Sequence, residues 1–208
     1  MSRGRLITLE GGEGAGKTTV LHSIRAWLER HGSSVVVTRE PGGTDAAEKI
    51  RALLLDPGTG RLDPLTELLL MFAARQENLS SVIRPALEAG HDVICDRFTD
   101  ASRAYQGGGR QLGPGPVEAL VDVVHPDLEP DLTLLLDVPV DIGLARVHGR
   151  GGSPDRMERN HPEFLQRVRD AYLELAARAP DRISVLDASR PLGEVIKTVE
   201  RTLEEKLL

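Results

Sequence analysis

A glycine-rich motif that follows a short apolar run is the feature that most constrains the fold of this chain. The run Leu6–Leu9 precedes residues 11–18, which match G-x-x-x-x-G-K-[ST] and open a helical pattern. Glycines let successive backbone N–H groups point at one anion, and the new helix adds its positive dipole end. Lys17 can reach terminal phosphates, and the Thr18 hydroxyl suits Mg²⁺. The motif therefore predicts a P-loop that binds a nucleoside triphosphate.

We expect the loop and the first helical turn to surround the phosphates of ATP. The residues are Gly11, Gly12, Glu13, Gly14, Ala15, Gly16, Lys17, Thr18 and Thr19.

Length and charge narrow the function further. A chain of 208 residues can bury a core as one domain, and its net charge of −6 provides no general basic field for nucleic acid. Of its 26 basic residues only four are lysines, and the planar fork of arginine suits phosphate contacts. Cys95 is the single cysteine, so no internal disulfide can form, and we expect it to be buried in a strand.

No apolar stretch of the sequence is long enough to cross a membrane. The longest uninterrupted one is Leu68–Ala74, and the first apolar run is too short for a signal peptide. We therefore predict a soluble cytoplasmic protein with one domain over residues 1–208, which binds neither membrane nor nucleic acid.

Short β-branched or leucine-rich runs alternate with longer helical patterns along the chain. Strands are expected at Leu6–Glu10, Val35–Thr38, Val93–Asp96, Leu132–Asp137 and Ile183–Asp187. Helices are expected at Thr18–His31, Asp45–Leu55, Pro64–Arg75, Ser80–Glu88, Pro116–Val124, Val140–Val147, Pro162–Arg178 and Leu192–Leu207. Helical crossovers between strands predict an α/β fold with a five-stranded parallel sheet and helices on both faces. Ligands of such sheets lie beyond the carboxyl ends of the strands.

One glycine-rich segment interrupts this alternation. Residues Gly107–Gly115 contain five glycines, one proline and only one apolar side chain, that of Leu112, and this composition predicts a mobile loop. A plain connector and a direct contact with a ligand are both compatible with that composition.

Several motifs beyond the P-loop resemble those of one family. They are Glu10-Gly11 with residues 13–18, Arg39-Glu40-Pro41-Gly42-Gly43-Thr44, Phe72-Ala73-Ala74-Arg75, Asp96-Arg97-Phe98 and residues 102–109, SRAYQGGG. In this order and spacing the chain resembles bacterial thymidylate kinases from the P-loop strand to the last helix. The resemblance implies a P-loop nucleoside monophosphate kinase that uses ATP and Mg²⁺ to convert dTMP to dTDP. It also implies a homodimer formed through helices between residues 45 and 88.

The resemblance assigns roles to the residues that handle the phosphates. Arg39, Arg51 and Arg97 are expected to meet the acceptor monophosphate, and the resemblance implies that the pair Asp96-Arg97 bridges the donor and acceptor phosphates. Mg²⁺ is expected at Thr18 and Asp96. The run that ends at Asp137 has the same apolar-then-acidic form as the run that ends at Asp96, and we prefer Asp96 because an arginine follows it.

Further residues of the acceptor site follow from the resemblance. Glu13 is expected near the 3′-hydroxyl, and Tyr105 where a ribose 2′-hydroxyl would collide. Arg75 and Gln106 can donate hydrogen bonds to base carbonyls, and Ser102 can bond the base edge.

The residue that stacks on the base is left open by the sequence. Phe72 offers an aromatic face, three residues before Arg75. In many relatives the stacking phenylalanine lies four residues before the arginine, where this chain has Met71. Phe72 remains our expected dTMP contact, with core packing as its alternative.

An arginine-rich segment over about residues 146–160 resembles the lid of the family. Its glycines and proline favour mobility, and its arginines favour phosphate contact. Because the P-loop carries no arginine, the resemblance implies catalytic lid arginines: Arg150 first, then Arg146 and Arg156. Another nucleoside monophosphate kinase, acting on dUMP or CMP, is the alternative enzyme. A regulatory ATPase or GTPase is the alternative class, although no Asn-Lys-x-Asp motif for guanine is present.

Overall fold

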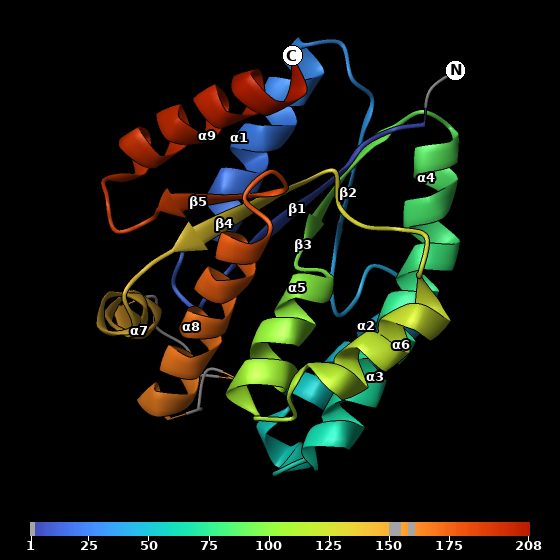
Figure 1. The fold of residues 1–208 in the computed structure, drawn as a ribbon, viewed down its shortest axis with the longest axis vertical. Helices are drawn as coiled ribbons and strands as arrows, with labels where there is room; N and C mark the ends of the chain where they lie inside the picture. Colours follow the sequence, from blue (N-terminus) through green and yellow to red (C-terminus); the bar gives the residue numbers. More distant parts are fainter. Residues whose placement is uncertain (1–2, 150–154, 158–160) are drawn as a thin grey trace.

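The computed structural model describes residues 3–149, 155–157 and 161–208. These residues form a five-stranded sheet, and its hydrogen-bonded strand pairs are all parallel (Figure 1). The strand order is β2-β3-β1-β4-β5. The strands are β1 (Leu6–Gly11), β2 (Val35–Arg39), β3 (Asp92–Asp96), β4 (Leu132–Asp137) and β5 (Ile183–Asp187). The predicted strands are confirmed within one residue at each end.

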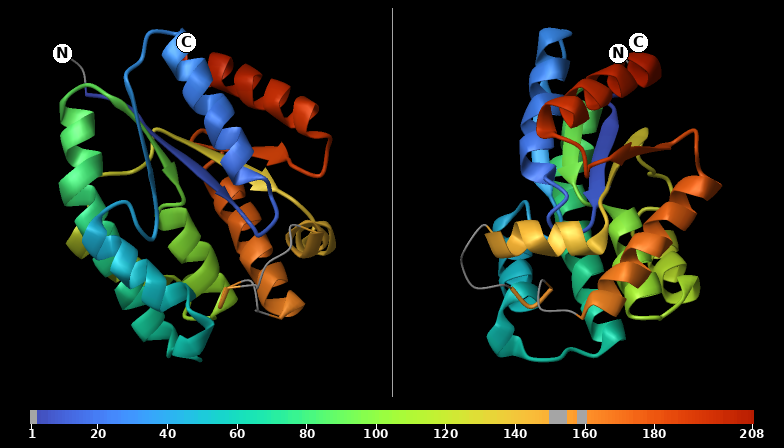
Figure 2. Two further views of the ribbon diagram at one scale, coloured as in Figure 1. Left: turned by 180° about the vertical axis from the view of Figure 1, so that it is seen from behind. Right: turned by 90° about the vertical axis from the view of Figure 1, so that its left-hand side faces the viewer.

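Helices cover both faces of the sheet, as the alternating pattern predicts. The α-helices are α1 (Lys17–Arg30), α2 (Asp45–Leu55), α3 (Pro64–Asn78), α4 (Arg84–Glu88), α5 (Thr99–Ser102), α6 (Pro114–Val124), α7 (Val140–Gly149), α8 (Pro162–Arg178) and α9 (Leu192–Leu207). Shorter turns are η1 (Pro57–Thr59), η2 (Leu79–Ile83) and η3 (Arg103–Gly109). Helices α1 and α9 lie together on one face, whereas α8 crosses the other (Figures 1 and 2).

Two apolar layers hold the sheet between these helices. Buried side chains of α1 and α9, including Trp27, pack with β1 and β4 on one side. On the other side α8 packs against β4 and η3, and Cys95 lies buried in β3 as a free thiol. Helices α3, α5 and α8 extend beyond the carboxyl ends of the strands (Figure 1). Those helices and strand ends surround the space where a ligand is expected.

The glycines that predicted a mobile loop lie in a packed turn instead. Residues Arg103–Gly109 form the π-helical turn η3, in which Gly107 and Gly109 are buried. A Cβ atom on Gly108 would lie 2.6 Å from the Cβ of Ala171, and one on Gly109 would lie 2.6 Å from Cε2 of Phe164. The prediction was wrong for this part of the segment, because its glycines permit close contact with α8 rather than motion.

Among the described residues, no helix is long and apolar enough to cross a membrane.

A buried histidine makes the stability of this fold depend on pH. The ring of His125 lies 6.2 Å from that of Phe72 and 5.1 Å from that of Phe98, and its nitrogens bond Thr99 and the Leu128 carbonyl. Burial, together with nearby arginines, lowers the pKa of His125 to about 4. Below pH 6.5 the unfolded chain therefore binds this proton more tightly than the folded chain, so stability falls as pH falls towards 4.

We expect the titration of His125 to lower the free energy of unfolding by about 3 kcal/mol between pH 7 and pH 4. The measurement is urea unfolding of the wild type and of His125→Gln across that range. The variant should be less stable at pH 7, and its deficit should shrink towards pH 4. If the free energy of unfolding falls equally with pH in both proteins, His125 is not the source of the pH dependence.

Candidate active site

The P-loop joins β1 to α1 at the carboxyl end of the sheet. Gly14 adopts a φ of 71°, and a Cβ atom there would lie 2.2 Å from the carbonyl oxygen of Gly143 in α7. Only glycine fits that combination of turn and close approach. Helix α1 starts after Gly16, and none of the described side chains caps its N-terminus. Its first backbone N–H groups are therefore available to an anion.

Lys17 lies in the first turn of α1 and folds back over the loop. Its Nζ donates hydrogen bonds to the carbonyl oxygens of Gly11 and Gly12, at 3.1 and 3.2 Å. Burial lowers the pKa of the Lys17 ammonium, and the charge of Arg97 acts in the same direction. An anion bound on the loop would stabilise the charged ammonium.

Arg97 follows β3 and turns its side chain towards the P-loop. It is held in the left-handed region, with φ 70°, while its N–H donates to the carbonyl of Leu9 at 3.0 Å. Its Nη2 donates to Oε1 of Glu13 at 3.0 Å, and its guanidinium lies 4.8 Å from the ring centre of Tyr105. The left-handed backbone of a non-glycine residue costs free energy, which the surrounding contacts must offset.

Glu10, the residue before the P-loop, supports that conformation from within the sheet. Its Oε1 accepts from the backbone N–H of Phe98 at 2.7 Å, and its Oε2 accepts from the hydroxyl of Tyr172 at 2.7 Å. Burial raises the pKa of Glu10 to about 7. Glu10 therefore fixes the peptide that follows Arg97, a role that the motif at residues 11–18 does not indicate. Tyr172, in α8, has no signal in the sequence because its contact spans the fold.

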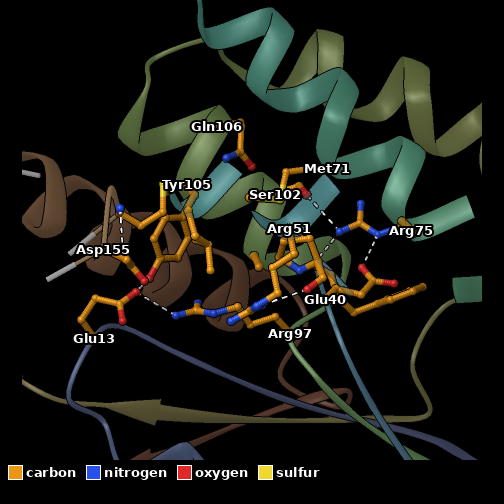
Figure 3. Close-up of a pocket in the computed structure, with 15 residues that line it drawn as sticks. Glu13, Glu40, Arg51, Met71, Arg75, Arg97, Ser102, Tyr105, Gln106 and Asp155 are labelled. Carbon is orange, nitrogen blue, oxygen red and sulfur yellow. Dashed lines mark hydrogen bonds and ion pairs between the residues drawn. The ribbon is translucent and has the colours of Figure 1, made fainter. Parts of the chain in front are cut away.

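A cavity of about 630 Å³, including its open mouth, lies next to the loop (Figure 3). Seven of the nine residues expected to bind the acceptor line it: Glu13, Arg51, Arg75, Arg97, Ser102, Tyr105 and Gln106. Residues to which the sequence analysis gave no individual role also line it: Glu40, Pro41, Leu55, Phe98, Ala101, Asp155 and Met157.

The far end of the cavity presents a buried guanidinium. Arg75 is 2% exposed; its Nε donates to Glu40 at 2.7 Å, and its Nη2 donates to the Phe98 carbonyl and to Oγ of Ser102, both at 3.0 Å. Within the described part of the chain, its Nη1 has no hydrogen-bond partner. Because a buried donor without a partner is costly, this N–H is suited to a ligand acceptor such as a base carbonyl.

Nearer the P-loop, Tyr105 and Glu13 form one hydrogen-bonded pair. The Tyr105 hydroxyl donates to Oε1 of Glu13 at 2.9 Å, so Tyr105 and Arg97 donate to the same carboxylate oxygen (Figure 3). Arg51 enters from α2 and donates to the carbonyl of Pro41 at 2.8 Å. The cavity is thus cationic near the loop and carries a polar, partly apolar surface at its far end.

Comparisons with known proteins identify the family to which this geometry belongs. The thymidylate kinase family model matches residues 9–199. The chain belongs to the thymidylate kinase family. It is 55% identical to the thymidylate kinase of Alkalilimnicola ehrlichii, over 98% of this chain and 94% of that protein. It is 52% identical to the thymidylate kinase of Chromohalobacter salexigens, over 100% of this chain and 98% of that protein. The crystal structure of the Ehrlichia chaffeensis thymidylate kinase superposes with a TM-score of 0.78 at 35% identity, covering 97% of this chain and 99% of that one.

Two residues expected at the acceptor lie outside the cavity. Arg39 pairs with Glu48 through two hydrogen bonds of 2.9 and 3.1 Å, and its side chain is 54% exposed. Phe72 is 2% exposed and packs with Leu68 and α6. Its expected contact with the base is corrected, because Met71 lines the cavity in its place. Met71 and Arg75 are four residues apart and share one face of α3, whereas Phe72 points to the neighbouring face.

These positions predict different effects for Met71→Ala and Phe72→Ala. Met71→Ala removes apolar surface from the cavity wall, so we expect KM for dTMP to rise about tenfold with little loss of stability. Phe72→Ala leaves a core cavity, so we expect a loss of about 3 kcal/mol of unfolding free energy. Acceptor kinetics and urea unfolding of both variants measure this. A larger KM effect from Phe72→Ala at unchanged stability would restore the stacking role of that ring.

The arginines expected to serve as catalytic lid residues differ in their placement. Arg146, near the end of α7, donates to the carbonyls of Gly14 and Ala188, at 3.3 and 2.8 Å. Arg156 donates from Nε to the carbonyl of Leu54 at 2.6 Å. Arg150 lies outside the described residues. The first two side chains therefore anchor the ends of the segment to the body of the protein.

Thr18 and Asp96, the expected Mg²⁺ residues, are on adjacent elements at this edge of the sheet. Thr18 is exposed in the first turn of α1. Asp96 ends β3, and its Oδ1 is buried with no hydrogen-bond partner among the described residues. An unpartnered carboxylate oxygen suits a hard cation or its bound water. Over the same residues no group of three or more His, Cys, Asp or Glu side chains could hold a metal. A binding mode with few protein ligands is typical of Mg²⁺ held largely by phosphates.

Proposed function

We propose that this chain transfers the γ-phosphoryl group of ATP to dTMP, with ATP on the P-loop and dTMP in the adjacent cavity. The observation that carries this is Arg97, whose guanidinium lies where the loop and the cavity meet. An acceptor phosphate bound there would face the terminal phosphate held by Lys17. Membership of the thymidylate kinase family supports dTMP as the acceptor.

Residues of the site can meet each requirement of phosphoryl transfer. An oxygen of the acceptor 5′-phosphate attacks the γ-phosphorus as the bond to the β,γ-bridging oxygen breaks, and ADP leaves. Lys17 and the loop N–H groups hold the donor, while Arg97 and Arg51 neutralise the acceptor phosphate. Thr18 and Asp96 would hold Mg²⁺, which supplies further charge neutralisation. Tyr105 and Glu13 occupy the sugar region, where Tyr105 would exclude a 2′-hydroxyl.

A panel of acceptors tests this function. With ATP and Mg²⁺, ADP formation should be fastest with dTMP and slower with dUMP, dCMP and CMP. Preference for another monophosphate would make the chain a different nucleoside monophosphate kinase. Absence of turnover with every acceptor would favour a regulatory ATPase.

Arg150 remains our first candidate for the catalytic lid arginine. Because Arg146 and Arg156 are engaged by protein carbonyls, Arg150→Ala should lower kcat and kcat/KM together, by at least about 10². Arg146→Ala and Arg156→Ala should act mainly on stability. Steady-state kinetics with thermal unfolding of the three variants measure this ranking. A kcat near that of the wild type in Arg150→Ala would contradict this assignment. The negative charge of the transition state would then be neutralised by Arg97 and the metal alone.

A homodimer through α2 and α3 is part of the same proposal. Leu53, Leu65 and Leu69 on these helices are 46–49% exposed, which leaves apolar surface for a second copy. Sedimentation at micromolar concentration should give twice the mass of the chain. A cytoplasmic location, for an enzyme of deoxynucleotide synthesis with one free cysteine, belongs to the proposal as well.

A further inference from the structure

A buried carboxylate in α3 lies behind the acceptor cavity and has no role so far. Glu67 has no exposed surface. It accepts hydrogen bonds from Nε2 of Gln106 at 2.8 Å, from Nε and Nη2 of Arg110, both at 3.1 Å, and from Nη2 of Arg156 at 2.8 Å. Of these donors, only Gln106 also lines the cavity.

The two guanidiniums keep Glu67 ionised despite its burial. Hydrogen bonds from Arg110, Gln106 and Arg156 outweigh desolvation and hold the pKa of this carboxyl below its usual value. An ionised carboxylate can only accept hydrogen bonds. The amide of Gln106 must therefore turn its NH₂ group towards Glu67, since the opposite orientation would set two oxygens against each other.

This orientation decides what Gln106 offers to a ligand. With Nε2 bonded to Glu67, the side-chain oxygen lies on the side of Ser102 and Met71 (Figure 3). Gln106 is 1% exposed, so its amide has little freedom to turn while Glu67 is charged. The cavity then presents an acceptor, the Gln106 oxygen, together with a donor, the unpartnered Nη1 of Arg75.

A donor and an acceptor side by side distinguish pyrimidine bases. Thymine and uracil carry an O4 acceptor next to an N3–H donor, which complement Arg75 and Gln106. Cytosine carries an N4 amino donor next to an N3 acceptor, which sets donor against donor and acceptor against acceptor. Each mismatch leaves buried polar groups unpaired and lowers affinity.

We propose that Glu67 is a positioning residue for specificity, which selects thymine over cytosine by fixing the orientation of the Gln106 amide. The proposal rests on the proposed function, because it concerns the base of the same acceptor. It also changes the part expected of Gln106, from a donor to base carbonyls to an acceptor from N3–H.

The test is Glu67→Gln, which keeps the shape of the side chain but adds an NH₂ donor. The Gln106 amide can then turn over and face the cavity with its own NH₂ group. We expect the ratio of kcat/KM for dTMP to that for dCMP to fall at least about tenfold, mainly through KM. In a Gln106→Leu background, Glu67→Gln should leave this ratio unchanged, because the group that it orients is absent.

Asp100→Asn is the matched control for loss of a buried charge. Asp100 lies between Arg103 and Arg182, with its side chain 3% exposed, and it does not line the cavity. This variant should lose stability and keep the dTMP-to-dCMP ratio. An unchanged ratio in folded Glu67→Gln would overturn the proposal and make Glu67 purely structural.

A second variant keeps the proposal testable where Glu67→Gln does not fold. Gln106→Leu alone should lower the dTMP-to-dCMP ratio at least about tenfold, and an unchanged ratio there would also overturn the proposal. Failure of the wild type to phosphorylate dTMP would instead overturn the proposed function, so the two failures are distinguishable.

Discussion

Lys17→Ala is expected to lower kcat at least about 10³-fold while the protein remains folded. Lys17 is the cation of the P-loop, and its Nζ already lies over the loop carbonyls of Gly11 and Gly12. Removing it takes a preorganised positive charge from the transferring phosphoryl group, where such charges act most strongly. Since burial lowers the pKa of this ammonium, its removal should cost little stability.

The measurement is ADP formation at saturating ATP and dTMP, with thermal unfolding as the check on folding. Lys197→Ala, an exposed lysine on α9, is the matched control and should keep wild-type kcat. Turnover by Lys17→Ala within tenfold of that of the wild type would contradict the assignment of residues 11–18 as the loop that binds the phosphates of ATP.

Arg97→Ala is expected to have an effect of similar size, at least about 10³ in kcat/KM for dTMP. Its guanidinium and the Tyr105 hydroxyl both donate to Oε1 of Glu13, where the P-loop meets the cavity. In the proposed function this charge faces both the donor and the acceptor phosphate, so one substitution weakens the binding of both. Arginine contributions of this kind in phosphoryl transfer are about 10³–10⁵ in rate. Arg97→Lys should recover only part of the loss, because lysine cannot form the same fork of contacts.

A backbone effect accompanies this substitution and can be separated from the loss of charge. Position 97 has a φ of 70°, which alanine also adopts at a cost, so Arg97→Gly relieves that strain while removing the same charge. Both variants should lose activity equally, whereas Arg97→Gly should unfold at a higher temperature than Arg97→Ala. Arg178→Ala, on the exposed face of α8, is the control for loss of an arginine. Activity in Arg97→Gly close to wild type would mean that the arginine matters for its backbone alone.

The sheet and its ligand edge could be predicted from the sequence because they depend on local patterns. Short apolar runs between helical periods are confirmed as β1 to β5, and the motif at residues 11–18 locates the loop. The turn η3 could not be predicted, because the glycines at 107–109 have the same composition whether they face solvent or pack against Phe164. Local composition does not report a contact made 55 residues later in the chain.

The same distinction between local patterns and distant contacts applies to the residues of the site. The charged side chains that follow strands, such as Arg97, could be assigned from position and resemblance. The direction of Phe72 could not, since a shift of one residue on a helix turns a side chain by about 100°. Glu10 and Glu67 were missed because their partners, Tyr172 and Gln106, come from distant elements.

The close packing of Gly108 and Gly109 on α8 bears on how acceptor preference can change in this family. Tyr105 and Gln106 belong to the same turn, so the two side chains that we propose to face the sugar and the base are attached to a backbone that packs closely against α8. That backbone cannot shift without separating the helix from the turn. A new acceptor would have to be accommodated by exchanging side chains on a stationary frame, and variants selected for altered acceptors should carry their substitutions at residues such as 67, 71 and 105 rather than in these glycines.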